Sequence, residues 1–115
     1  MDFNGLDFDM SIRIMKDSKI IGPGMAILLE NVKRYESLNK ATAKMGMAYS
    51  KAWKIIKNAE SSLGAPILER RIGGSGGGGA VLSKDGEYLL ETYQQFVEEA
   101  NVEVEKVFKK YFECR

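Results

Sequence analysis

The nine residues from Ile72 to Ala80 contain six of the chain's twelve glycines, and neither a helix nor a central strand is expected to run through them. Such a tract is a linker between domains, a phosphate-binding loop or the tip of a hairpin. A linker needs an independent domain on each side. The residues after the tract predict a single long helix with nothing further to pack on, which disfavours a linker.

The phosphate-loop interpretation is also weak. Gly74–Gly79 satisfies the dinucleotide pattern G-x-G-x-x-G, but any run of glycines does so, and the strand-like run Ala80–Leu82 follows where a helix should begin. A Walker loop would need a lysine and a serine or threonine at Ala80 and Val81. The remaining interpretation is a hairpin that runs out along Ile67–Ile72 and returns along Ala80–Leu82.

Length and composition describe one small globular domain. The chain has 115 residues, 44% of them hydrophobic, and its apolar runs are too short to cross a membrane. The N-terminal ten residues are acidic and lack a signal-peptide pattern, so we expect a cytoplasmic protein. One cysteine, Cys114, and no histidine are present, which removes the commonest general base and zinc ligand. We therefore expect neither enzymatic activity nor a cofactor.

The residues before the hairpin predict two short strands and a helix-turn-helix. Residues 11–21 alternate apolar and polar and then break, as two strands joined by a short turn would. From residue 25 to 64, apolar residues recur at helical spacing. Asn39 is a favourable N-cap for the second helix of this segment, and Gly46 supplies the left-handed turn that ends it.

The third helix of this segment is predicted to begin near Ala48 and to end at Gly64. It has one apolar side and one polar, cationic side, which is what a helix that docks on a protein body and reads DNA requires. The residues predicted to face inward are Ala52, Ile56, Ala59 and Leu63.

The charge pattern agrees with DNA as a partner. Residues 40–72 carry seven basic and two acidic side chains, a net charge of +5, between acidic flanks. Lys57, and Lys44 on the preceding helix, are placed for phosphates. We expect Trp53 in the core, whereas the pattern does not separate core edge from DNA contact for Tyr49. Base contacts in the major groove are expected from Ala48, Tyr49, Ser50, Lys51 and Lys54.

Beside a helix-turn-helix, a hairpin over residues 66–82 is a wing. Arg70 and Arg71 lie on its outgoing strand, where either can enter the minor groove or pair with phosphates. Gly76 and Gly77 at the tip lack side chains, so their amides can approach the phosphate backbone closely.

Residues 84–112 predict one long helix with Ser83 as its N-cap. Apolar residues alternate at spacings of three and four, which is typical of a coiled-coil seam. A helix lying on its own core would need a wider stripe, which Leu89, Phe96 and Phe108 would add. We favour a homodimer, because so short a chain leaves little core for so long a helix. The seam consists of Leu90, Tyr93, Val97, Ala100, Val104, Val107 and Tyr111.

In this order, the segments resemble the N-terminal DNA-binding domain of the molybdate-responsive regulators (ModE type), which are close to the LysR-type winged helices. The resemblance is carried by Met47–Trp53 with its Y-x-x-A-W core, by Leu63–Arg70, by the tract Gly73–Gly79 and by Leu82-Ser83-x-x-Gly86. It implies a winged helix-turn-helix, a recognition helix over Ala48–Leu63 and dimerisation through the terminal helix.

The chain departs from that family in two respects. Its members usually have serine or threonine where this chain has Ala48. Full-length regulators also carry a C-terminal oxyanion-binding module, and this chain ends at Arg115 without one, so we do not expect molybdate binding.

The sequence therefore predicts a mostly α fold with a small β component. It is a single winged helix-turn-helix domain over residues 1–115 with a long C-terminal dimerisation helix. The predicted function is sequence-specific binding of double-stranded DNA as a homodimeric transcription regulator, with the recognition helix in the major groove and the glycine-rich wing on the backbone or minor groove. The alternative is a protein-interaction module whose acidic C-terminal helix pairs with a separate sensor or partner chain. A membrane partner is not expected.

Overall fold

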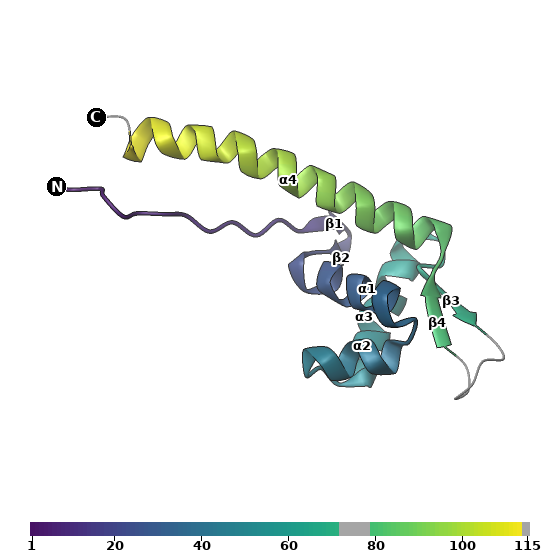
Figure 1. Cartoon of the computed structure of the whole chain (residues 1–115). Helices are drawn as coiled ribbons and strands as arrows, with labels where there is room; N and C mark the ends of the chain where they lie inside the picture. Colours follow the sequence, from purple (N-terminus) through teal and green to yellow (C-terminus); the bar gives the residue numbers. More distant parts are fainter. Residues whose placement is uncertain (72–78, 114–115) are drawn as a thin grey trace.

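The structure is a computed structural model that describes residues 1–71 and 79–113. It confirms the predicted fold class, a winged helix-turn-helix followed by a long helix (Figure 1). The elements are β1 (Ile14–Lys16), β2 (Ser18–Ile21), α1 (Pro23–Tyr35), α2 (Leu38–Met45), α3 (Tyr49–Leu63), β3 (Leu68–Arg71), β4 (Gly79–Leu82) and α4 (Lys84–Phe112).

Helices α1, α2 and α3 and the β1–β2 hairpin enclose the core. Leu28 and Val32 on the inner side of α1 and Ile56 of α3 are almost completely buried. Ala41 on α2 and Ala52 on α3 are also fully buried, and their small side chains let the helices approach closely. The core is therefore built from the apolar stripes at helical spacing that the sequence contains.

The β1–β2 hairpin is antiparallel, as predicted from residues 11–21. Its turn places Asp17 in the left-handed region with φ of 60°, a conformation that aspartate tolerates better than most residues. Ile20 and Ile21 of β2 are buried against the helices. The hairpin thus covers an edge of the core that the three helices leave open.

Two details of the helix ends differ from the prediction. Helix α2 is capped by Ser37, whose Oγ accepts a hydrogen bond from the Lys40 N–H at 3.1 Å, so Asn39 lies inside the first turn. Leu63 is 38% exposed instead of buried, because α3 ends there and the next residue turns the chain away from the core. Gly64 ends α3 in the left-handed conformation, with φ of 73°, as expected.

The wing is anchored to the end of α1 through Glu36. Strands β3 and β4 pair antiparallel, with Arg70 opposite Ala80 and Arg71 opposite Gly79, which confirms the hairpin. The Ala80 N–H donates to the Glu36 carbonyl oxygen at 3.2 Å, and the Glu36 carboxylate pairs with the Arg71 guanidinium. A Cβ on Gly79 would lie 2.5 Å from the Glu36 oxygen, so the close approach requires glycine.

Several hydrogen bonds join the base of the wing to the first turn of α4. Ser83 caps α4 as predicted, with its Oγ accepting from the Gly86 N–H at 2.9 Å and donating to the Pro66 carbonyl at 2.5 Å. The Ser83 N–H donates to the Ile67 carbonyl at 2.9 Å. A Cβ on Gly86 would lie 2.2 Å from that same Ile67 oxygen. The start of α4 therefore lies against the wing root with no room for a side chain.

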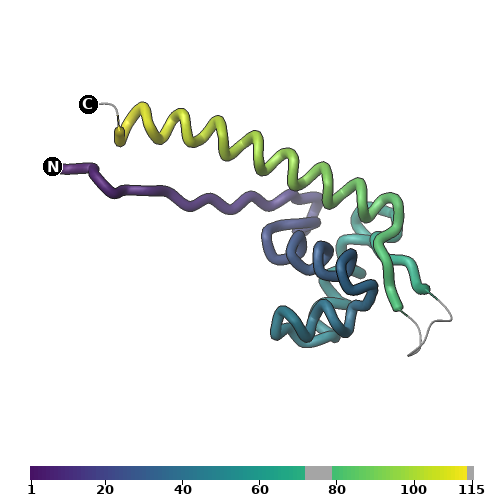
Figure 2. Tube along the Cα trace, viewed as in Figure 1, coloured from purple at the N-terminus to yellow at the C-terminus, as the bar shows by residue number. Residues whose placement is uncertain are grey.

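Helix α4 extends far beyond the body, and the N-terminal arm, residues 1–13, runs beside it (Figures 1 and 2). Two ring contacts join arm and helix: Phe3 to Phe112, with centroids 5.2 Å apart, and Phe8 to Phe108, at 5.1 Å. Because α4 projects from the body, the molecule is elongated, with extents of 61 × 28 × 20 Å.

The arm is also tied at its other end, where the Tyr93 hydroxyl donates to the Ile12 carbonyl at 2.7 Å. Burial raises the pKa of the Tyr93 phenol, and the positive charge of Arg13 acts in the opposite direction. Because the folded pKa is raised, the stability linked to this phenol is present below about pH 10 and is lost as the pH rises through the folded pKa.

The predicted seam of α4 is divided between two environments. Leu90 and Tyr93 are 2% and 6% exposed because they pack in the core of the same chain, so they cannot also line an interface between copies. That part of the interface prediction is corrected. Val97 and Ala100 are half-buried, whereas Val104, Val107 and Tyr111 are exposed on the projecting part of the helix.

Replacement of Gly86 by alanine tests the junction between wing root and α4. Because the added Cβ would collide with the Ile67 carbonyl, Gly86→Ala should lower the free energy of unfolding by about 1–3 kcal/mol. Gly24→Ala in α1 is the matched control, since nothing lies within 4 Å of its Cβ, and it should raise stability by up to about 1 kcal/mol. Urea denaturation followed by circular dichroism measures both, and a neutral Gly86→Ala would contradict the tight junction.

Candidate nucleic-acid interface

Helix α3 presents a polar, cationic face opposite the residues that it buries. Ala52, Ile56 and Ala59 are buried on one side. The predicted base-contacting residues lie on the exposed part of the helix and at its N-cap, with Tyr49 44% exposed. Within the described residues, Lys51 and Lys54 have no ion-pair partner, so both charges are available to an anionic ligand. The exposed predicted contacts are Ala48, Tyr49, Ser50, Lys51 and Lys54.

The side of α3 that faces the wing carries a second stripe of residues. Tyr49, Trp53, Lys57 and Glu60 follow at spacings of four, four and three, so they lie along one side of the helix. The prediction that Trp53 lies in the core is wrong, because its side chain is 37% exposed. The spacing of four residues between Tyr49 and Trp53 is the signal that places both rings on the same side.

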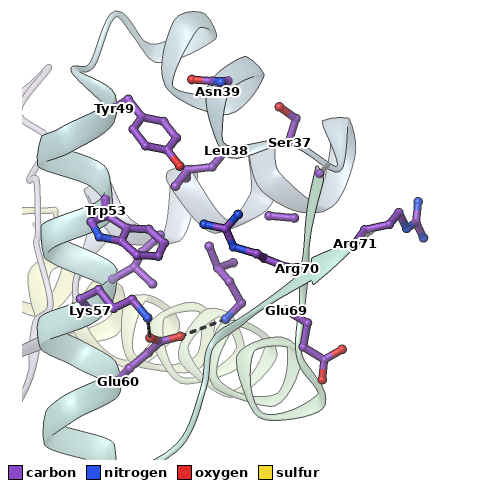
Figure 3. A pocket seen from close by; sticks show the side chains of 14 residues that line it. Ser37, Leu38, Asn39, Tyr49, Trp53, Lys57, Glu60, Glu69, Arg70 and Arg71 are labelled. Atoms are coloured by element: carbon purple, nitrogen blue, oxygen red, sulfur yellow. Dashed lines mark hydrogen bonds and ion pairs between the residues drawn. The ribbon is translucent and has the colours of Figure 1, made fainter. Parts of the chain in front are cut away.

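A cavity of about 330 Å³ lies between this stripe and the wing (Figure 3). We call it the helix–wing cleft and define it by six of its lining residues. From β3, Arg70 extends into the cleft toward the two aromatic rings, whereas Arg71 points away from it (Figure 3). The defining residues are Tyr49, Trp53, Lys57 and Glu60 of α3 and Leu68 and Arg70 of β3.

Both carboxylate oxygens of Glu60, on the α3 side of the cleft, have partners within the protein. One Glu60 carboxylate oxygen accepts hydrogen bonds from the N–H groups of Ile67 at 2.7 Å and Leu68 at 3.2 Å. The other lies 3.4 Å from the Lys57 ammonium. Glu60 therefore holds the wing root against α3, and its negative charge is balanced within the protein.

The predicted phosphate contacts are distributed over three elements. The Lys57 ammonium lies 4.5 Å from the centroid of the Trp53 ring, and the Lys44 ammonium on α2 lies 5.8 Å from that of Tyr35. Arg70 has no partner within the described residues, in contrast to Arg71, which pairs with Glu36. Gly76 and Gly77, predicted at the wing tip, lie outside the described residues.

Other kinds of site are not apparent in the part of the chain that the structure describes. Residues 1–71 and 79–113 contain no group of three or more acidic or cysteine side chains placed to bind a metal ion. Among those same residues, no helix is both long enough and apolar enough to span a bilayer.

The three-helix body, the wing and the cationic α3 define a winged helix-turn-helix domain. In agreement, the sequence pattern of the bacterial regulatory helix-turn-helix proteins of the lysR family matches residues 26–87. The chain belongs to this family. Within it, the chain is a winged helix-turn-helix domain of the ModE type, as its relatives show.

Three relatives illustrate the similarity. The chain is 34% identical over 73 residues to the molybdenum-pterin-binding protein MopB of Rhodobacter capsulatus, which is 64% of this chain and 27% of MopB. It is 30% identical over 79 residues to the transcriptional regulator ModE of Haemophilus influenzae, 69% of this chain and 31% of ModE. It is 32% identical over 71 residues to the DNA-binding transcriptional dual regulator ModE of Escherichia coli, 62% of this chain and 27% of that protein. The aligned part of the chain thus spans less than a third of each relative.

Proposed function

We propose that this chain is a sequence-specific DNA-binding transcription regulator that acts as a homodimer. The observation that carries the proposal is the exposed face of α3, where Ser50, Lys51 and Lys54 stand clear of the body beside a wing. Its relatives named ModE are transcriptional regulators, which supports binding rather than catalysis as its activity. A regulator of this kind acts in the cytoplasm, where the bacterial chromosome lies.

In this proposal, the N-terminal turns of α3 read the DNA sequence, and the cationic side chains around them bind the DNA backbone. The N-terminal turns of α3 enter the major groove, where short and cationic side chains reach base edges. Lys44, Lys57 and Arg70 bind phosphates, which position the domain without reading sequence. Arg71 is assigned to anchoring the wing, because its guanidinium pairs with Glu36 at the end of α1 and points away from α3 (Figure 3). The base-reading residues are Ala48, Ser50, Lys51 and Lys54, whereas Tyr49 lies on the side of the same turn that faces the wing.

Dimerisation is assigned to the projecting part of α4. Val104, Val107 and Tyr111 are 37%, 54% and 59% exposed, and their spacing of three and four residues puts them on one face. Phe3 and Phe8 of the arm pack on Phe108 and Phe112 along the same stretch and widen the apolar surface. Two copies joined through this surface would present two recognition helices to a two-fold symmetric operator.

The proposal does not include molybdate binding by this domain. The family pattern covers residues 26–87, which hold the helix-turn-helix, the wing and the first turn of α4. The molybdenum in the name of MopB belongs to that protein, of which the aligned part is 27%. We propose double-stranded DNA as the partner of this domain.

Replacement of Lys54 tests base reading by α3. Duplexes selected from a random pool by the wild-type chain should bind less tightly as salt rises, because phosphate-bound lysines and arginines release counterions. Lys54→Ala should change the order of preference among these duplexes, by about 5- to 100-fold for the base pair that Lys54 contacts. Fluorescence anisotropy with labelled duplexes measures the affinities.

The control for this experiment removes one lysine far from α3. Lys106, on the projecting part of α4, is 69% exposed and pairs with Glu103. Lys106→Ala should leave the order of preference unchanged. If Lys54→Ala also leaves it unchanged, or if the wild-type chain binds no duplex at low salt, the assignment of α3 is wrong.

A pair of valines tests the dimer. Val104→Asp would place a carboxylate in the proposed interface and should convert a dimer into a monomer in light scattering. Val102→Asp is the matched control, because Val102 is 51% exposed on the same helix and two residues away, which is nearly the opposite face. A wild-type chain that is monomeric at micromolar concentrations would instead favour the alternative, in which α4 pairs with a separate partner chain.

A further inference from the structure

We infer that the helix–wing cleft is a binding site for the sugar-phosphate backbone of the duplex, in which Tyr49 and Trp53 contact the deoxyribose and Arg70 pairs with a phosphate. This inference rests on the proposed DNA binding and extends it. It assigns a ligand to a cavity and to a tryptophan that base reading by the outer face of α3 leaves without a role.

The first argument is the exposure of two large aromatic side chains next to one another. Tyr49 and Trp53 are 44% and 37% exposed, although aromatic rings contribute most to stability when they are buried. Both line the helix–wing cleft, and the Tyr49 hydroxyl points into it (Figure 3). Within the described residues that hydroxyl has no hydrogen-bond partner. An apolar wall with an unused donor is suited to a ligand that has both an apolar and a polar part.

The second argument is the charge that the cleft offers to a ligand. Glu60 is engaged by Lys57 and by two backbone N–H groups. Glu69, the other acidic residue at the cleft, points away from the aromatic rings on the opposite side of β3 (Figure 3). Arg70 points inward with no partner among the described residues. The available charge is therefore positive, and the ligand is an anion.

The third argument is the place of the cleft in the molecule. A duplex whose major groove receives α3 has a sugar-phosphate strand along each wall of that groove, and the minor groove lies beyond each of these strands. If the wing reaches that minor groove or its edge, the strand between the two grooves passes between α3 and the wing. The helix–wing cleft lies in that position. A sugar-phosphate strand also has the required chemistry, because each repeat joins an anionic phosphate to a deoxyribose with an apolar face.

The chain provides its own reporter, because Trp53 is its only tryptophan. The probe is a duplex of arbitrary sequence, since the backbone is the same in every sequence. Adding this duplex to the full chain at low salt should change the emission of Trp53, and raising the salt should reverse the change. An emission that stays constant while anisotropy of the labelled duplex reports binding would overturn the inference and leave the proposed function standing.

Neighbouring arginines on β3 give the matched variants. Arg70→Gln should weaken binding to all duplexes and lower the slope of log affinity against log salt by about one, because one phosphate contact is lost. Arg71→Gln should leave the slope unchanged, because Arg71 points away from the helix–wing cleft and the glutamine amide can still donate a hydrogen bond to Glu36, which keeps the wing anchored. Equal slopes for the two variants would overturn the inference, provided that thermal denaturation shows both to be folded.

Replacing the tryptophan separates packing from charge. Trp53→Leu should weaken binding about 5-fold or more for every duplex without changing the salt slope, and Trp53→Phe should restore most of the affinity. If deoxyadenosine monophosphate or inorganic phosphate saturates the Trp53 signal and displaces the duplex, the cleft is a small-molecule site and the backbone assignment fails. If no duplex binds at low salt, the proposed function fails, and the inference fails with it.

Discussion

The main chain of Ile67 is the point at which three parts of the protein are joined. Its N–H donates to Glu60 of α3, and its carbonyl accepts from the N–H of Ser83 at the start of α4. The same carbonyl lies against Gly86, and the Ile67 side chain is 1% exposed in the core. Because one residue holds α3, the wing root and α4, their relative positions are set together.

The position of the wing follows from this junction and from a second attachment at the end of α1. There Glu36 adopts a left-handed conformation, with φ of 52°, and offers its carbonyl to β4 and its carboxylate to Arg71 of β3. The wing is thus held at its root by α3 and further along by α1. The helix–wing cleft is the space that remains between these attachments, and its walls are fixed by hydrogen bonds rather than by the side chains that a ligand would contact.

The sequence predicted the elements well because their signals are local. The glycines at 46 and 64, the cap at Ser83 and the alternating apolar pattern each depend on residues within a few positions, and the structure agrees with them. Predictions that depend on how segments far apart in the chain pack together were less accurate. Trp53 was expected in the core and is exposed, and Leu63 was expected to be buried and is exposed. Each error concerns which neighbour covers a side chain, which periodicity alone does not show.

The division of α4 shows the same limit. Its apolar residues at spacings of three and four identify a face, but not what covers that face. Leu90 and Tyr93 are covered by the chain's own core, whereas Val104, Val107 and Tyr111 extend beyond it. The seam looks uniform in sequence because helical spacing is the same over a core and beyond it.

The sequence by itself determined the order of helices, wing and long helix, the cationic side of α3 and the ModE-type character of the domain. Only the tertiary structure decided that Arg70 points into the helix–wing cleft while Arg71 pairs with Glu36, and that Tyr49 and Trp53 line one wall of a cavity. The physical reason is that helix ends, turns and amphipathic faces depend on neighbours in the chain. The partner of a charge or a ring depends on segments that folding brings together from distant positions.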